Sequence, residues 1–140
     1  MRFMVIVKAD KRTEAGTLPS VKDLEVMGRF NEELVKAGAL VDGAGLQPTS
    51  KGARIANRGG KLQVTDGPFA ETKEIIAGYW ILDVASKAEA IEWCKRVPFD
   101  CLPHDGRDAE LELRQVYDVA DFPNAPQSVV EREERFKAKK

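Results

Sequence analysis

Two stretches of the chain are almost continuously apolar, residues 3–7 and 76–84, and they predict strands that are buried on both faces. Residues 40–46 form a weaker strand candidate, because two glycines interrupt the run. Residues 110–119 begin with strict alternation of charged side chains and leucines, which predicts a strand with one charged and one buried face. The chain is therefore expected to contribute four strands to one sheet.

Helical spacing of apolar residues follows the first and the third of the four expected strands, which are the two most apolar ones. Apolar side chains recur every three or four residues between Leu24 and Leu34, behind Ser20, which is a favourable N-terminal cap. A second helix is expected to begin at Ser86, where a capping box is present, and to end before Pro98. The pattern thus predicts two amphipathic helices that each follow a strand.

Glycines mark an additional hairpin between the second and the third core strand. Gly59-Gly60 separates residues 54–56 from residues 61–64, and glycines supply the positive φ angles of a tight turn. Residues 8–17 are polar and are expected to form a loop. The order is then βαββαβ with an inserted β-hairpin, a ferredoxin-like arrangement of the α+β class. Both helices should cover one face of a four-stranded antiparallel sheet, with the two most apolar strands in its centre.

The other face of this sheet carries apolar side chains from the central strands and needs a cover. A second copy of the chain is the simplest cover, so a homodimer with facing sheets, a dimeric α+β barrel, is expected. Residues 1–120 should form this α+β domain. Residues 121–140 are expected to be a linker followed by a charged helical tail.

The amino-acid composition argues against several classes of function, although it says little about the fold. The 140 residues contain 22 Lys and Arg against 23 Asp and Glu, so the basic surface of a general nucleic-acid binder is not indicated. Two cysteines and one histidine are too few for a disulfide framework or a usual zinc site, and no glycine-rich phosphate loop is present. The apolar start is too short for a signal sequence or a membrane span. We therefore expect a cytoplasmic protein without a metal or organic cofactor and without nucleic-acid or membrane partners.

Residues 66–74, which begin Asp66-Gly67-Pro68-Phe69, resemble the YCII-related family in its DGPF-domain branch. The resemblance runs along most of the chain, through segments 3–7, 78–79, 90–93, 112–114 and 121–122. It implies a dimeric α+β barrel with a cleft at the sheet face. A histidine–aspartate acid/base pair is inferred for the YCII branch, with the histidine in the first helix, where this chain has Met27. Members of the DGPF branch are linked with alternative sigma factors, which implies a role near transcription initiation.

Three candidate residues lie in loops. Asp66 precedes a Gly-Pro turn, where its carboxylate either caps the turn amides or acts as a general base at the rim of the cleft. Phe69 in the same turn either plugs a core or contacts a substrate. His104, in the loop 103–106, has an ordinary pKa of ~6.5 that suits proton transfer, although lone loop histidines are more often surface residues.

Four further candidates lie on strands. Glu112 and Arg114 share the charged face of the last strand. If the leucines pack under the helices, Arg114 would bind an anionic substrate in the space between the sheets and Glu112 would orient it. The alternative is the solvated face of an edge strand. Asp42 and Tyr79 either point into the same cleft or are an ordinary edge residue and a core aromatic.

Two functions stay open at this stage. The first is a cofactor-independent acid/base enzyme of the lyase or isomerase type that acts on a small anionic compound in a cleft of the dimer. The second is a non-catalytic ligand-binding or regulatory protein linked with sigma-factor-dependent transcription. Convergence of Asp66, Glu112 and Arg114 on one enclosed cavity would favour the first function. Separate, solvent-facing positions would favour the second.

Overall fold

Four strands form one antiparallel sheet in the computed structural model, which describes residues 1–71, 74–104 and 108–138. The strands follow the order β2-β5-β1-β6 across the sheet. Their bounds are Arg2–Lys8 for β1, Leu40–Gly45 for β2, Ile76–Asp83 for β5 and Leu111–Gln115 for β6. The two most apolar strands, β1 and β5, are central, and this confirms the predicted ferredoxin-like arrangement of the α+β class.

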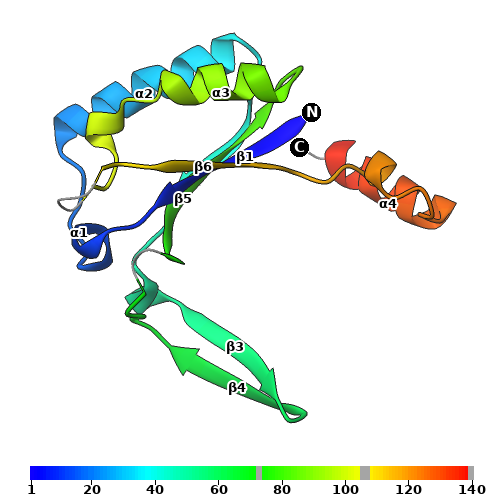
Figure 1. Ribbon diagram of the computed structural model, residues 1–140, viewed down its shortest axis with the longest axis horizontal. Helices are drawn as coiled ribbons and strands as arrows, with labels where there is room; N and C mark the ends of the chain where they lie inside the picture. The colour runs from blue at the N-terminus through cyan, green and yellow to red at the C-terminus, as the bar shows by residue number, and fades with distance from the viewer. Residues whose placement is uncertain (72–73, 105–107, 139–140) are drawn as a thin grey trace.

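Two helices, α2 (Val21–Lys36) and α3 (Lys87–Lys95), lie together on one face of the sheet (Figure 1). Each begins at the serine expected from the sequence. The hydroxyl oxygens of Ser20 and Ser86 each accept a hydrogen bond of 3.1 Å from the backbone amide three residues further on. These bonds satisfy amides that a helix leaves without an internal partner.

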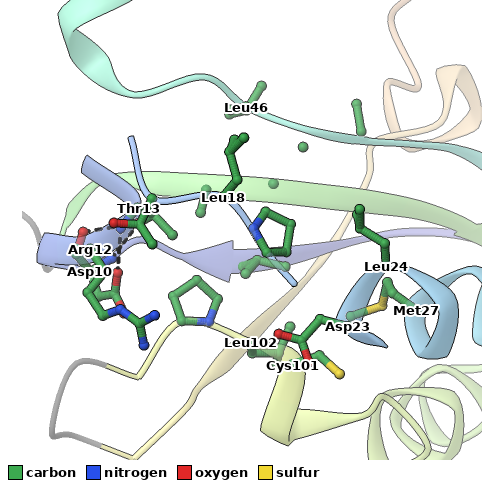
Figure 2. A pocket seen from close by; sticks show the side chains of 18 of the residues that line it. Asp10, Arg12, Thr13, Leu18, Asp23, Leu24, Met27, Leu46, Cys101 and Leu102 are labelled. Carbon is green, nitrogen blue, oxygen red and sulfur yellow. Dashed lines mark hydrogen bonds between the residues drawn. The ribbon is translucent and has the colours of Figure 1, made fainter. Parts of the chain in front are cut away.

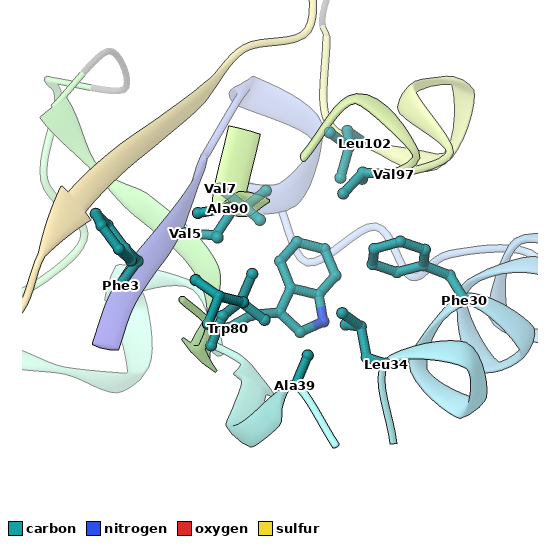
Figure 3. Close-up of a cluster of buried hydrophobic side chains, with 12 residues drawn as sticks. Phe3, Val5, Val7, Phe30, Leu34, Ala39, Trp80, Ala90, Val97 and Leu102 are labelled. Carbon is teal, nitrogen blue, oxygen red and sulfur yellow. The ribbon is translucent and has the colours of Figure 1, made fainter. Parts of the chain in front are cut away.

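The hydrophobic core lies between the sheet and these two helices (Figure 3). Phe30 of α2 meets Trp80 of β5 edge to face, with ring centroids 5.8 Å apart. The indole Nε1 of Trp80 donates a hydrogen bond of 2.8 Å to Oδ1 of Asn31, so its polar atom is satisfied although the residue is buried. The largest fully buried side chains are Phe3, Val5, Leu34 and Leu82.

The predicted hairpin forms a separate two-stranded sheet of β3 (Ala53–Arg58) and β4 (Lys61–Asp66). It projects from the side of the four-stranded sheet that is opposite to α2 and α3 (Figure 1). The two glycines of its turn have φ angles of 59° and 83°, as the sequence predicts. Ile55 pairs with Val64 across the hairpin, and both side chains are exposed together with Leu62.

Two stretches differ from the sequence-based expectation. The expected loop contains a short helix, α1 (Lys11–Glu14), because Asp10 and Thr13 cap it reciprocally. The last strand ends at Gln115 and not near residue 119. The partner strand β1 begins at Arg2, and this leaves few backbone groups to pair with a longer β6. Beyond Gln115, the amide of Val116 still donates to the carbonyl oxygen of Arg2.

The C-terminal segment lies apart from the core. Helix α4 (Gln127–Ala138) buries none of its side chains, and Nζ of Lys137 lies 3.3 Å from Oδ2 of Asp118. Residues 139–140 of the expected tail, 72–73 of the 66–74 stretch and 105–106 of the loop that contains His104 lie outside the described residues. Among the described helices, none combines the length and apolar character needed to cross a bilayer.

Candidate functional site

A cavity of about 690 Å³ opens between α1, the start of α2, the end of β2 and the segment 100–104 (Figure 2). This volume is in the range of small-molecule binding sites. Its apolar wall includes Leu18, Leu24, Met27, Leu46 and Leu102. Its charged and titratable side chains include Asp10, Arg12, Asp23, Cys101 and His104. A mostly apolar pocket with a few polar groups is the usual form of a ligand site.

Asp10 brings a carboxylate to the wall of this cavity and is only 3% exposed. Its Oδ1 accepts the backbone amide of Thr13 at 2.8 Å, and its own amide donates to Oγ1 of Thr13 at 2.9 Å. A buried carboxylate is costly without hydrogen bonds, and the helix cap supplies one. The capping box therefore fixes both the short helix and the position of the carboxylate.

Arg12 adds a positive charge on the same helix, two residues beyond Asp10. Its exposed side chain lines the cavity, and no ion pair among the described residues involves it. A guanidinium keeps its charge at all relevant pH values and has several donors for a carboxylate or phosphate. The side chain is therefore available to an anionic ligand.

Asp23 and Cys101 lie across the cavity from α1 (Figure 2). Burial raises the pKa of the Cys101 thiol above its ordinary value, and its hydrogen bond to Asp23 and the negative charge of that residue raise it further. A thiol that stays protonated is a weak nucleophile, so the site does not favour cysteine chemistry. His104 lines the cavity three residues beyond Cys101. Among the described residues, no group of three or more acidic, histidine or cysteine side chains could hold a metal ion.

Of the residues predicted from the sequence, His104 and Tyr79 are among those that line this cavity, but the Tyr79 ring itself lies on the other face of the sheet. Tyr79 alternates along β5 with Gly78 and Trp80, so its ring leaves the sheet on the face away from the helices. There its hydroxyl donates to Oδ2 of Asp42 at 3.3 Å. The charge of Asp42 raises the pKa of the Tyr79 phenol, with smaller contributions from burial and the hydrogen bond. The phenol therefore stays protonated at neutral pH.

Glu112 and Arg114 also lie on the face of the sheet away from the helices, because the leucines of β6 pack against the core. Oε1 of Glu112 accepts from Nζ of Lys8 at 3.1 Å, and its Oε2 accepts from Nη1 of Arg114 at 3.4 Å. The hydrogen bond and charge of Lys8, followed by the bond from Arg114, lower the pKa of Glu112. The Arg114 side chain is 71% exposed in the single chain.

Asp66 and Phe69 lie at the base of the hairpin. Asp66 is the exposed last residue of β4. The amide of Gly67 donates to the carbonyl oxygen of Gly52 at 3.1 Å, and the amide of Phe69 donates to Oγ1 of Thr49 at 3.0 Å. These two amides of the turn are thus bonded by the segment 49–52, and neither Asp66 nor Phe69 lines the cavity.

The predicted residues are therefore distributed over three places: the cavity, the open face of the sheet and the base of the hairpin. Asp66, Glu112 and Arg114 do not share one cavity in the single chain, so the convergence that would favour an enzyme built on these three residues is absent. An enzyme function has to rest instead on the residues of the cavity beside α1. Sequence reasoning missed Asp10 and Arg12 as site residues, because their segment was assigned to a loop. The spacing of Asp10 and Thr13 is the signal of a capping box and would have identified the helix that positions them.

Comparison with known proteins finds a family model, a curated relative and a solved structure that are similar to this chain. The family model of the YCII-related domain matches residues 1–117. An uncharacterised protein of Rhizobium meliloti (strain 1021) is 39% identical over 75 residues, which span 54% of this chain and 58% of that protein. A solved structure of the 5-chloro-2-hydroxyhydroquinone dehydrochlorinase of Burkholderia phenoliruptrix AC1100, in complex with 2,5-dihydroxybenzoquinone, is similar with a TM-score of 0.47 and 12% identity. That similarity covers 86% of this chain and 98% of the solved one.

Proposed function

This chain belongs to the YCII-related family, and we propose that it is a cofactor-independent acid/base enzyme of the lyase or isomerase type. Its substrate would be a small anionic compound that binds in the cavity beside α1. The observation that carries this proposal is the grouping of charges around one apolar cavity. Arg12 stands on α1 next to Asp10, while Asp23 and His104 come from other segments of the wall.

The charged residues of the cavity would have different roles in the reaction. Arg12 would bind the anionic group of the substrate through charge-assisted hydrogen bonds. His104 would take a proton from a carbon atom next to that group. Return of the proton to another atom gives an isomerisation, and departure of a leaving group with its electron pair gives an elimination. Both outcomes need only groups that the cavity already contains.

A thermal-shift screen with small carboxylates and phosphates tests the binding step, because any compound that binds the native state raises its melting temperature. Arg12→Met should weaken binding of a hit by about tenfold or more, as expected for loss of a charge-assisted bond. Arg58→Met, the same exchange on the exposed hairpin, should leave binding unchanged. Equal loss in both variants, or no hit at all, would count against this site.

Deuterium incorporation from D2O into a bound hit, followed by NMR, tests the acid/base step. The wild-type protein should exchange a carbon-bound hydrogen of the hit. His104→Gln should abolish this exchange and keep most of the binding, because the residue handles the proton and not the anion. Binding without any exchange in the wild type would instead support the alternative function, a non-catalytic ligand-binding or regulatory protein.

We also propose that the chain forms a homodimer through the open face of its sheet. Met4 and Ile81 are half-buried and alternate with core residues along the two central strands, so their side chains point away from the helices. Glu112 and Arg114 flank them on β6. A second sheet on this face would cover the apolar side chains and enclose Arg114, and a stable interface of this kind buries on the order of 2,000 Å².

Sedimentation velocity at micromolar concentration tests the dimer. The wild-type chain should sediment as a dimer, and Ile81→Asp should produce monomers because it places a charge in the interface. Val35→Asp is the matched control, since Val35 is already exposed on α2. A monomeric wild-type protein, or dimers of Ile81→Asp, would contradict the proposed interface.

A further inference from the structure

A chain of hydrogen bonds links the Asp66–Phe69 turn to the helix that carries the charges of the cavity. Glu14 is the last residue of α1, and its Oε1 accepts the backbone amide of Thr49 at 3.1 Å. Its Oε2 accepts the hydroxyl of Thr49. The same hydroxyl oxygen accepts the amide of Phe69 at 3.0 Å. A threonine hydroxyl has one hydrogen to donate and lone pairs that accept, so both of its bonds form at once.

The turn fits closely against the segment that carries Thr49. A Cβ atom built on Gly67 would lie 1.8 Å from the carbonyl oxygen of Thr49 and 2.5 Å from its carbonyl carbon. Any side chain at position 67 would therefore displace one of the two segments. Together with the bond from the Gly67 amide to Gly52, this contact seats the turn directly on residues 49–52.

Helix α1 needs such a contact, because four residues make a single helical turn that is not stable alone. Its N-terminus is held by the Asp10–Thr13 cap, and its last residue is held by Thr49. The residues between these two points include Arg12, which lines the cavity. Thr49 thus holds the end of α1 that is opposite to the cap, and Arg12 lies between the two points.

We propose that Glu14, Thr49 and the Gly67–Phe69 turn are positioning residues that hold α1, and with it Asp10 and Arg12, at the cavity. This inference rests on the proposed function for the identity of the site. It gives the turn a role in binding without placing any of its side chains in contact with the ligand. The motif at residues 66–69 then acts through Thr49 and Glu14, at a distance from the chemistry.

Site-resolved amide hydrogen exchange tests the coupling in the protein without any ligand. Thr49→Val keeps the shape of the side chain but removes the hydroxyl, so the amides of Phe69 and of Thr13 in α1 should both exchange about tenfold faster. Thr49→Ser retains a hydroxyl and should restore slow exchange at both amides. Thr65→Val makes the same substitution on the exposed β4 and should change neither amide.

Two outcomes would overturn the proposal. In the first, Thr49→Val accelerates exchange at Phe69 but not at Thr13, which would show that the coupling ends at Thr49. In the second, Thr49→Val accelerates exchange equally at amides throughout the chain. This would show that the hydroxyl stabilises the whole fold and does not specifically couple the turn to α1. If Thr49→Val does not fold, Glu14→Met takes its place, because methionine keeps the length of the side chain and removes both acceptor oxygens. Unchanged exchange at Thr13 in that variant would overturn the proposal equally. Because hydrogen exchange is measured without a ligand, the coupling can be absent while the proposed enzyme function holds. Equally, the coupling can be present while the proposed enzyme function is wrong.

Discussion

The four-stranded sheet and the β3–β4 hairpin contain the same kinds of side chains but bury them to opposite extents. Leu82 in β5 is 2% exposed, whereas Leu62 in β4 is 76% exposed. Both residues lie in regular antiparallel strands. The difference is the layer above them, because α2 and α3 cover one face of the sheet and no element of the described chain covers the hairpin in this way. Burial therefore depends on what packs on a strand, and the strand sequence alone does not determine it.

The largest difference between the two regions should appear when the same leucine truncation is made in each. Leu82→Ala removes a fully buried side chain and should lower the free energy of unfolding by about 3 kcal/mol. Leu62→Ala removes an exposed one and should cost less than about 0.5 kcal/mol. Urea denaturation at low protein concentration measures both values. Similar costs at the two positions would mean that the hairpin is covered in solution, and the comparison would then fail.

The junction between the two regions should be sensitive at Gly67 and tolerant at Gly52. Gly67→Ala forces a Cβ atom against the Thr49 carbonyl and should cost about 2 kcal/mol, the usual cost of overpacking. A Cβ atom at Gly52 would meet only an ordinary contact at 3.7 Å, so Gly52→Ala should change the melting temperature little. Thermal unfolding of the two variants decides the point. Equal tolerance would show that the turn can move away from residues 49–52.

The smallest expected effect concerns ion pairs and their dependence on pH. The pKa of Glu112 is lowered in the folded chain from an ordinary value of 4.5, chiefly by Lys8. The ionised side chain therefore stabilises the fold above pH 4.5, and this contribution is lost as the pH falls through the lower folded pKa. Glu112→Gln should thus melt below the wild type at pH 7, and the difference should shrink below pH 4.5.

Glu71→Gln provides the matched control in the hairpin region. Glu71 pairs with Arg54 at 3.4 Å, and both side chains are 52% exposed, so solvent screens this pair strongly. The Glu71 variant should differ less from the wild type at every pH. A larger effect at Glu71 than at Glu112 would contradict the contrast between the sheet and the hairpin.

The fold could be predicted from the sequence because its signals are local. Continuous apolar runs identified β1 and β5, serine caps identified α2 and α3, and paired glycines identified the hairpin. The cavity could not be predicted in the same way. Its wall combines Asp10 of the β1–α1 junction, Asp23 of α2 and His104 of a distant loop, and only the packing of these segments brings them together.

The strand alternation also placed Glu112 and Arg114 on the face away from the helices, where they are found. From the sequence, the ligand is also expected to bind on that face. This expectation needs a second copy of the chain to enclose the space, so the strand alternation alone does not support it. The cavity of the single chain lies on the other side, beside α1 and α2. A pattern within one strand indicates a face, but it does not indicate which face receives a ligand.

The far end of the hairpin has a practical consequence for labelling the protein. The Gly59-Gly60 turn joins two paired strands whose ends are adjacent, and it lies at the tip that projects from the body (Figure 1). A Cβ atom at either glycine would meet no other atom within 4 Å, so there is open space around the tip. Exposed tips of this kind accept foreign segments readily. An epitope or a fluorescent domain spliced between these glycines would leave both chain termini native and would give imaging experiments a handle remote from the cavity.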